Sequence, residues 1–145
     1  MKITVENIPE GSEPEIIIRC SEADESLVQL IYSMNSVSKK LVGSKDMQMH
    51  IIDPNEVFYF EAVDNKVFIY CKEKVFEAKL KLYEIEAQYE KSDFFRATKS
   101  TILNISKIEV VNPIFYGKFE ALLKNGEKVY ISRQYVPEFK RKLGL

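Results

Sequence analysis

Histidine and cysteine are scarce in this sequence. Its 145 residues include one histidine, His50, and two cysteines, Cys20 and Cys71, which lie far apart in the chain. The paired Cys or His spacings of zinc sites are therefore missing, and with a single histidine most pairings of a nucleophile with a base cannot be assembled. The two cysteines are expected to be reduced thiols that serve as small packing groups. We predict no enzymatic activity, no metal site and no cofactor.

Long hydrophobic runs are missing as well. The apolar runs are short, as at Ile16–Ile18, and fall far below the roughly 20 residues that a helix needs to cross a membrane. Residues 1–6 alternate in polarity and lack the apolar stretch of a signal peptide. Hydrophobic residues make up 46% of the chain and charged residues 30%, as expected for a soluble, folded protein. These features predict a cytoplasmic protein of one domain with a short appendage, and no membrane insertion.

The net charge of −1 conceals an uneven distribution along the chain. Residues 1–42 and residues 43–91 each carry a net charge of −3, whereas residues 92–145 carry 10 basic and 5 acidic residues, a net charge of +5. Phosphate binding depends on the local positive potential rather than on the total charge. The C-terminal excess is therefore compatible with nucleic-acid binding, although solvated surface lysines produce the same pattern.

The N-terminal 43 residues are predicted to form a β-α extension. Lys2–Val5 alternates in polarity and Glu15–Cys20 is rich in isoleucine, and both features are typical of strands. Ser21 begins a helix whose first residues are acidic, and Gly43 marks its end. The helix carries an apolar stripe of Leu27, Leu30, Met34, Val37 and Leu41. This stripe either packs inside the monomer or forms the seam of a homodimer, because its spacing also fits a heptad.

From residue 44 onward the pattern is mostly β. Asp64-Asn65 and Asn125-Gly126 are hairpin signals, and short helices are expected at residues 80–89 and 134–143. The expected strands are Met47–Ile52, Val57–Val63, Val67–Cys71, Val75–Ala78, Phe94–Ala97, Ile102–Asn104, Glu109–Phe115, Lys118–Leu123 and Lys128–Ser132. We predict a mainly β fold, α+β overall, with residues 1–43 as the extension and residues 44–145 as the principal domain.

Three segments of the principal domain carry distinctive motifs. In Phe94–Asn104 an aromatic-x-Arg segment leads into a polar turn, a serine and a final asparagine. Val57–Lys66 has Glu-Ala before an Asn-containing loop, and Leu122–Tyr135 is a hairpin that ends in Ser-Arg-x-Tyr. In type and order these segments resemble the LytTR family of bacterial DNA-binding domains, over roughly residues 44–145. The resemblance implies an elongated stack of small antiparallel sheets, with one or two short helices, whose loops enter successive major grooves of DNA.

The same resemblance places the DNA contacts on three loops. Asn65 and Lys66 match the first loop, Thr98, Lys99 and Ser100 the second, and Arg133 with Gln134 the third. Arginine can bind guanine through two parallel hydrogen bonds and asparagine can pair with adenine, whereas lysine and serine suit phosphate oxygens. This sequence departs from the family at Thr98-Lys99, where His or Arg is frequent.

Several of these residues also have a purely structural interpretation. Arg133 could hold a carboxylate at the end of a strand, and Asn65 could serve only as the positive-φ residue of a hairpin. Lys99 could be a solvated turn lysine, and Ser100 could merely cap the local backbone. Arg96, inside the Phe94–Asn104 motif, fits an internal ion pair as well as a phosphate contact.

The leading hypothesis is a sequence-specific transcriptional regulator that binds double-stranded DNA as a homodimer, with imperfect direct repeats as its sites. A receiver domain is not expected, because the segment before residue 43 is too short for one. The alternative hypothesis is a protein-interaction or small-ligand-binding module without DNA binding. A steep salt dependence of DNA binding would distinguish the two, because neutralising phosphates releases counterions.

Overall fold

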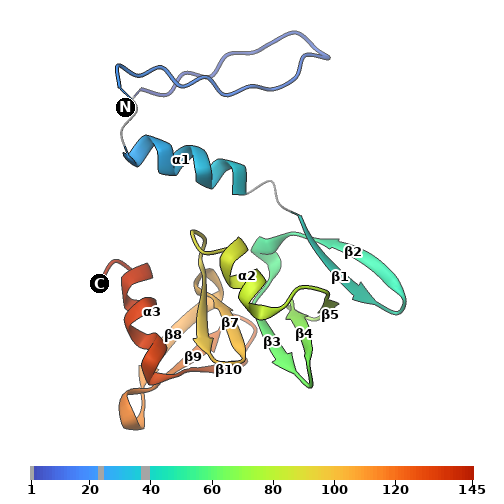
Figure 1. Cartoon of the computed structure of the whole chain (residues 1–145), viewed down its shortest axis with the longest axis vertical. Coiled ribbons are helices and arrows are strands. Elements are labelled where there is room, and N and C mark those ends of the chain that lie inside the picture. The colour runs from blue at the N-terminus through green and yellow to red at the C-terminus, as the bar shows by residue number, and fades with distance from the viewer. Residues whose placement is uncertain (1, 23–24, 37–39) are drawn as a thin grey trace.

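The computed structural model describes residues 2–22, 25–36 and 40–145 (Figure 1). Residues 2–22 run as extended chain with one turn, in which the Ser12 amide donates a hydrogen bond of 3.1 Å to the Pro9 carbonyl. Helix α1 (Glu25–Ser36) lies between this segment and the rest of the molecule. Residues 40–145 fold into two antiparallel sheets and two short helices.

The larger sheet has seven strands in the order β2-β1-β5-β4-β3-β7-β6. Most neighbouring strands are hairpin partners, while the pairs β1–β5 and β3–β7 join segments that are distant in sequence. The strands are β1 (Leu41–Lys45), β2 (Gln48–Ile52), β3 (Tyr59–Val63), β4 (Lys66–Tyr70), β5 (Val75–Ala78), β6 (Phe94–Thr98) and β7 (Thr101–Asn104).

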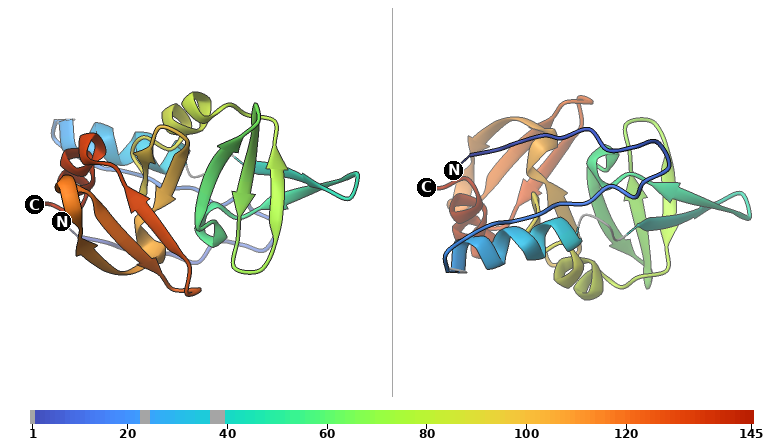
Figure 2. Two further views of the ribbon diagram at one scale, coloured as in Figure 1. Left: turned by 90° about the horizontal axis from the view of Figure 1, so that it is seen from below. Right: turned by 90° about the horizontal axis from the view of Figure 1, so that it is seen from above.

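The smaller sheet has three strands, β8 (Ile108–Pro113), β9 (Phe119–Leu123) and β10 (Lys128–Ile131), in the order β10-β9-β8. Figure 2 shows this sheet at one end of the domain and the β1–β2 hairpin projecting from the other. Helix α2 is Leu82–Gln88 and helix α3 is Val136–Lys142. Four single-turn 3-10 helices are η1 (Pro54–Glu56), η2 (Ile105–Lys107), η3 (Phe115–Gly117) and η4 (Arg133–Tyr135).

Two hydrophobic cores lie on opposite faces of the β3-β7-β6 end of the larger sheet. Because side chains alternate along a strand, Phe94 points into the core beneath α2 and the next residue, Phe95, points into the core shared with the smaller sheet and α3. Ile102 and Leu103 divide between the two cores in the same way. Burial on both faces explains why these strands read as continuous apolar runs rather than as alternating ones.

The predicted mainly β architecture is confirmed, as is each strand predicted after residue 44, with ends that shift by one or two residues. The two predicted helices appear as α2 and α3, and Pro137 lies in the first turn of α3, where a proline is tolerated. The strand predicted over Glu109–Phe115 begins at Ile108. It stops at Pro113, and Phe115 belongs to η3.

Strand β1 was not predicted, and the prediction that the first helix runs through Leu41 to Gly43 is wrong. Leu41 is buried in the core beneath α2, and Gly43 pairs with Ala78 of β5. At Gly43 the close approach of β5 leaves no room for a side chain, since a Cβ there would lie 2.6 Å from Phe76 Cβ and 2.7 Å from Ile52 Cδ1. The glycine serves sheet packing rather than helix termination. The predicted boundary between residues 43 and 44 would cut this strand.

Replacing Gly43 with alanine is expected to lower the free energy of unfolding by at least about 1 kcal/mol, because the added methyl overpacks the contact with Phe76. Urea unfolding followed by circular dichroism measures the change. Ser44→Ala, one residue along the same strand, is the control and should stay within about 0.5 kcal/mol of wild type. Equal midpoints for the two variants would contradict the close β1–β5 contact.

The strands predicted at Lys2–Val5 and Glu15–Cys20 are wrong, because residues 2–22 contain no strand. An isolated pair of amphipathic segments has no third strand or helix face on which to bury its apolar side, and Ile3 and Ile16 are exposed. Cys20 is exposed too, so it is not the packing group that we expected, whereas Cys71 is half-buried and free. Burial raises the pKa of the Cys71 thiol.

We propose that residues 40–145 form an independent domain, because both cores lie within them. A fragment of these residues should fold and unfold cooperatively, whereas a fragment of residues 44–145 should be less stable because it loses the buried Leu41. Circular dichroism melting curves of both fragments and the full chain test this prediction. An unfolded 40–145 fragment would mean that the N-terminal segment completes the core.

Candidate nucleic-acid interface

The three predicted loops lie together along one edge of the domain. Antiparallel pairing of β3 with β7 places the end of β3 beside the β6–β7 turn, where the Ala62 amide donates a hydrogen bond of 2.8 Å to the Ser100 carbonyl. On the other side of that turn, the Ser132 amide donates a hydrogen bond of 2.8 Å to the Ala97 carbonyl. These two bonds fix the β6–β7 turn between the β3–β4 turn and the segment after β10.

The first loop is the tight turn Asp64-Asn65 between β3 and β4. Both residues have positive φ, 50° and 63°, and Val63 pairs with Lys66 across the turn. This is the geometry of a two-residue hairpin loop, for which Asn and Asp are favoured. Asn65 thus does supply positive φ, and its side chain and that of Lys66 are also exposed to solvent.

Arg96 supports the second loop through hydrogen bonds. Its Nη1 donates a hydrogen bond of 2.7 Å to the Lys99 carbonyl, while its Nε and Nη2 bind Glu86 Oε2 at 3.0 and 2.9 Å. Of the two interpretations of Arg96, the internal ion pair is correct. The guanidinium is thus engaged by Glu86 and by the backbone of the turn, and the Lys99 side chain is exposed.

Thr98 and Ser100 close the second loop through their own side chains. The Ser100 amide donates a hydrogen bond of 3.1 Å to Thr98 Oγ1, which also lies 3.4 Å from Ser100 Oγ. Both hydroxyls therefore shape the turn, and Ser100 remains exposed. A hydroxyl can accept and donate at the same time, so this role leaves capacity for a further partner.

The third loop begins where η4 follows β10. Arg133 and Gln134 are both exposed, and the stem of Arg133 lies across Gly117, where an added Cβ would meet Arg133 Cγ at 3.2 Å and Cδ at 3.3 Å. Among the residues that the structure describes, Arg133 forms no ion pair. The interpretation of Arg133 as the holder of a carboxylate is therefore not supported, and its guanidinium is available.

Further contacts lie at the ends of these strands that point away from the loops. Tyr59, at the start of β3, stacks on Tyr70, at the end of β4, with ring centroids 4.4 Å apart. Burial raises the pKa of both phenols, and the Glu127 carboxylate adds to the effect at Tyr59. Lys142, at the C-terminal end of α3, donates hydrogen bonds of 2.7 Å to the carbonyls of Glu90 and Ser92, and burial lowers its pKa. These bonds hold the end of α3 against the segment that precedes β6.

Sequence reasoning missed two features of this region. One is the hydrogen bond by which Arg96 supports the second loop at the Lys99 carbonyl, since the sequence offered an ion pair for Arg96 but no bond to the loop. The other is the η3 turn at Phe115-Tyr116-Gly117, which touches Arg133 through Gly117. Two adjacent aromatic residues before a glycine resemble a strand end, and only the structure reveals that both rings face solvent.

Within the described parts of the chain, no three His, Cys, Asp or Glu side chains come close enough together to hold a metal ion. None of the helices in those parts combines the length and the apolar character that crossing a membrane requires.

Known proteins are similar to this chain in sequence and in architecture. Residues 47–144 match the family model described as LytTr DNA-binding domain. Sensory transduction protein LytT of Enterococcus faecalis is 32% identical over 98 residues, which cover 68% of this chain and 40% of that protein. An uncharacterized HTH-type transcriptional regulator of Staphylococcus aureus strain NCTC 8325 is 30% identical over 136 residues, or 92% of each chain. The solved LytTr DNA-binding domain of a putative methyl-accepting/DNA response regulator from Bacillus cereus superposes with a TM-score of 0.70 at 27% identity, over 74% of this chain and 99% of that one.

Proposed function

The chain belongs to the LytTr DNA-binding domain family, and we propose that it is a sequence-specific transcriptional regulator that binds double-stranded DNA through its three loops. DNA binding follows from the family, and the relative from Staphylococcus aureus, which matches over 92% of each chain, is named as a transcriptional regulator. A regulator of this kind acts on the chromosome, hence in the cytoplasm. The observation that carries the residue assignment is the pair of backbone hydrogen bonds, from Ala62 to Ser100 and from Ser132 to Ala97, that join the bases of the loops.

Each loop has its own task in this proposal. Arg133 reads a guanine in the major groove, because a free guanidinium can donate two parallel hydrogen bonds to O6 and N7, and Gln134 beside it contacts an adjacent base. Asn65 reads a base from the first loop. The remaining assigned residues, Lys66, Thr98, Lys99 and Ser100, contact phosphates and set the position of the protein on the duplex.

The net charge of −1 does not oppose this proposal. Positive side chains occur in all three loops, at Lys66, Lys99 and Arg133, and the last 54 residues carry a net charge of +5. Acidic residues are concentrated before residue 92. Attraction to phosphate acts within about one Debye length, ~8 Å at physiological salt, so the three cations of the loops count for more than acidic residues elsewhere in the chain. Asp64, in the first loop, is the one carboxylate that lies beside the assigned residues in sequence and offsets part of this charge.

Selection of bound sequences from a random DNA pool tests the proposed function. We expect the purified full chain to enrich one motif, repeated at a fixed spacing, and to lose affinity steeply as salt is raised. Binding that is equal for enriched and scrambled duplexes would contradict sequence-specific recognition. Absence of binding at low salt would contradict DNA binding altogether.

We also propose that the chain acts as a homodimer on imperfect direct repeats, with α1 as part of the seam. Leu30 of the predicted stripe is 43% exposed, and Val28, which lies outside that stripe, is 39% exposed, so α1 has apolar surface for a partner helix to cover. Leu41 is excluded from this seam because it is buried in β1. Val37 lies outside the described residues, and α1 ends one residue before it.

Replacing Leu30 with glutamate is expected to shift the dimer toward monomer without unfolding the β domain. An unpaired carboxylate buried in an apolar seam is strongly unfavourable, whereas the same group in water is not. Sedimentation velocity at several concentrations measures the shift, with the neighbouring Gln29→Glu as control for the added charge. A wild-type chain that stays monomeric at the highest concentration would rule out the seam.

A further inference from the structure

The turn between β8 and β9 carries two aromatic side chains that are exposed to solvent. Phe115 is 85% exposed and Tyr116 is 86% exposed, on the single-turn helix η3. Tyr116 has a φ of 63°, and Gly117 follows with a φ of 73°. Large apolar side chains in water are unfavourable, and a non-glycine residue in the left-handed region is uncommon unless it is Asn or Asp. Both features oppose aromatic residues at this turn.

Nothing in the fold of the turn requires these rings. The turn is closed by backbone hydrogen bonds alone, 2.9 Å from the Ile114 amide to the Lys118 carbonyl and 3.4 Å from the Lys118 amide to the Phe115 carbonyl. Asn or Gly would adopt the same backbone with less strain. Backbone strain of this kind is found preferentially at ligand-contacting positions, so the exposed rings indicate contact with a partner.

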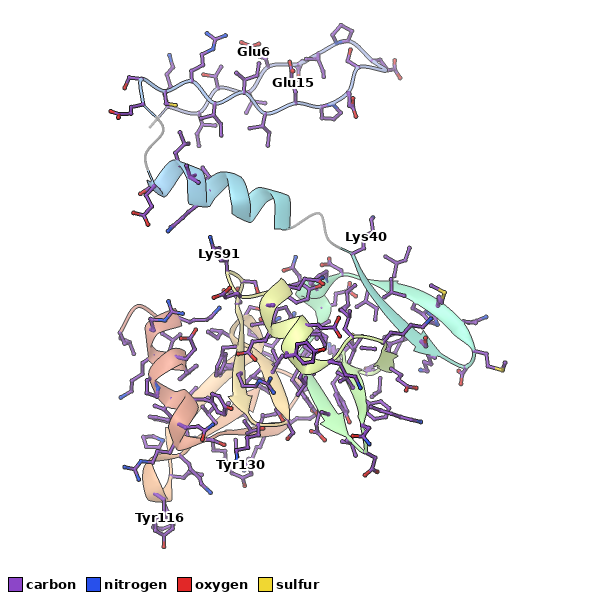
Figure 3. All side chains as sticks on the ribbon, viewed as in Figure 1. Glu6, Glu15, Lys40, Lys91, Tyr116 and Tyr130 are labelled. Atoms are coloured by element: carbon purple, nitrogen blue, oxygen red, sulfur yellow. The ribbon has the colours of Figure 1, made fainter. Side chains whose placement is uncertain are left out.

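The position of the turn identifies that partner. Gly117 lies under the stem of Arg133, with 3.2 Å between its ideal Cβ position and Arg133 Cγ. Figure 3 shows Tyr116 and Tyr130 at the same end of the molecule, away from α1, and Tyr130 of the adjoining sheet is 54% exposed. Three exposed aromatic rings therefore lie at the end of the molecule that carries the third loop proposed to contact DNA.

We propose that the Phe115-Tyr116 turn is a fourth DNA-contacting element, which reads thymine methyl groups next to the base bound by Arg133. This inference rests on the proposed binding of DNA through Arg133. Base edges in the major groove are polar except for the thymine C5-methyl, which favours contact with apolar side chains such as phenylalanine. The turn thereby adds a preference for thymine beside the guanine contact, which it reads through the methyl group rather than through hydrogen bonds.

The test removes the rings and the methyl groups separately. Phe115→Ser combined with Tyr116→Asn deletes both rings while Asn keeps the left-handed backbone. Two duplexes are compared. The thymine duplex is the one selected from the random pool. The uridine duplex is the same DNA with deoxyuridine in place of each thymine that flanks the base read by Arg133, which is the base whose preference is relaxed in the Arg133→Ala variant. Tyr83→Ala is the matched control, because Tyr83 is 69% exposed on α2, far from the turn in sequence. Melting curves verify that each variant is folded.

For the wild type and the Tyr83 control, we expect each methyl removed to weaken binding by about fourfold, the factor that burial of one methyl-sized group contributes. The double variant should bind the thymine duplex more weakly and lose nothing further on the uridine duplex. If it binds both duplexes as the control does, the rings have no role on DNA and the inference is overturned, while wild-type binding keeps the proposed function intact.

Two other results would overturn the inference in different ways. If the double variant binds more weakly but uridine makes no difference to the wild type, the rings contact DNA elsewhere, for instance as a wedge that kinks a base step, and methyl reading is wrong. If the wild type binds no duplex at all, the proposed function fails and the inference fails with it.

Discussion

Replacing Arg133 with alanine is expected to lower the affinity for the preferred DNA site by about 1–3 kcal/mol and to relax base preference at one position. The expectation follows from the loss of a bidentate contact to guanine. The side chain is exposed and unpaired among the described residues, so the domain should remain folded. Arg133→Lys provides the sharper comparison, because it keeps the charge but loses the planar fork. It should retain affinity for random DNA and lose most of the base preference.

Lys99→Ala should behave differently from Arg133→Ala. Lys99 is exposed on a loop that Arg96 fixes through the Lys99 carbonyl, so removing the side chain leaves the loop in place. Loss of one phosphate contact should weaken binding to preferred and scrambled duplexes about equally and reduce the magnitude of the salt slope by about one. Titration of labelled duplexes against each variant, at several salt concentrations, measures both effects. If the Arg133→Ala variant binds the preferred and the scrambled duplex with the same affinities as the wild type, the third loop does not read bases.

Replacing Asn104 with leucine is expected to lower the free energy of unfolding by about 2–4 kcal/mol. Asn104 is only 2% exposed, its Nδ2 donates a hydrogen bond of 2.7 Å to the Val57 carbonyl, and its Oδ1 accepts 3.0 and 2.8 Å hydrogen bonds from the Ser106 amide and hydroxyl. Losing the amide leaves a buried carbonyl unpaired, which costs about 1–3 kcal/mol, and removes the cap of η2, which costs about another 1 kcal/mol.

Urea unfolding with linear extrapolation measures the effect of the Asn104 substitution. Ser106→Ala is the control, because Ser106 is exposed and its amide keeps the bond to Asn104, so its cost should stay near 1 kcal/mol. If the Asn104→Leu variant has the same urea midpoint as the wild type, the buried amide adds little to the free energy of unfolding. The asparagine at the end of the Phe94–Asn104 motif would then need a role other than this junction.

Most of the β domain could be predicted from sequence because its strands are local and bounded by clear turn signals. Asp64-Asn65 and Asn125-Gly126 both connect adjacent strands as expected. Strand β1 could not be predicted, because Leu41 has the spacing of the preceding helical stripe and Gly43 is a common residue after a helix. The pairing of β1 with the distant β5 overrides both local signals.

The sequence could name candidate residues for the site but not how the fold holds them together. The three motifs pointed to Asn65, Lys99 and Arg133, and the structure brings their loops together. That Arg96 is a support rather than a phosphate ligand depends on Glu86 of α2, ten residues away, which no local pattern relates to it. The contact of Gly117 with Arg133 likewise joins segments whose relation exists only in the folded sheet.

The hydrogen bond from Asn104 to Val57 also bears on how fast the protein folds. It spans 47 residues and lies where β3 pairs with β7, whereas most other strand pairs are hairpins. Hairpins close within about 1–10 μs, but bringing distant segments together costs loop entropy before any contact repays it. We therefore expect the β3–β7 joint to limit the folding rate, with the hairpins on either side forming and dissolving many times before it closes.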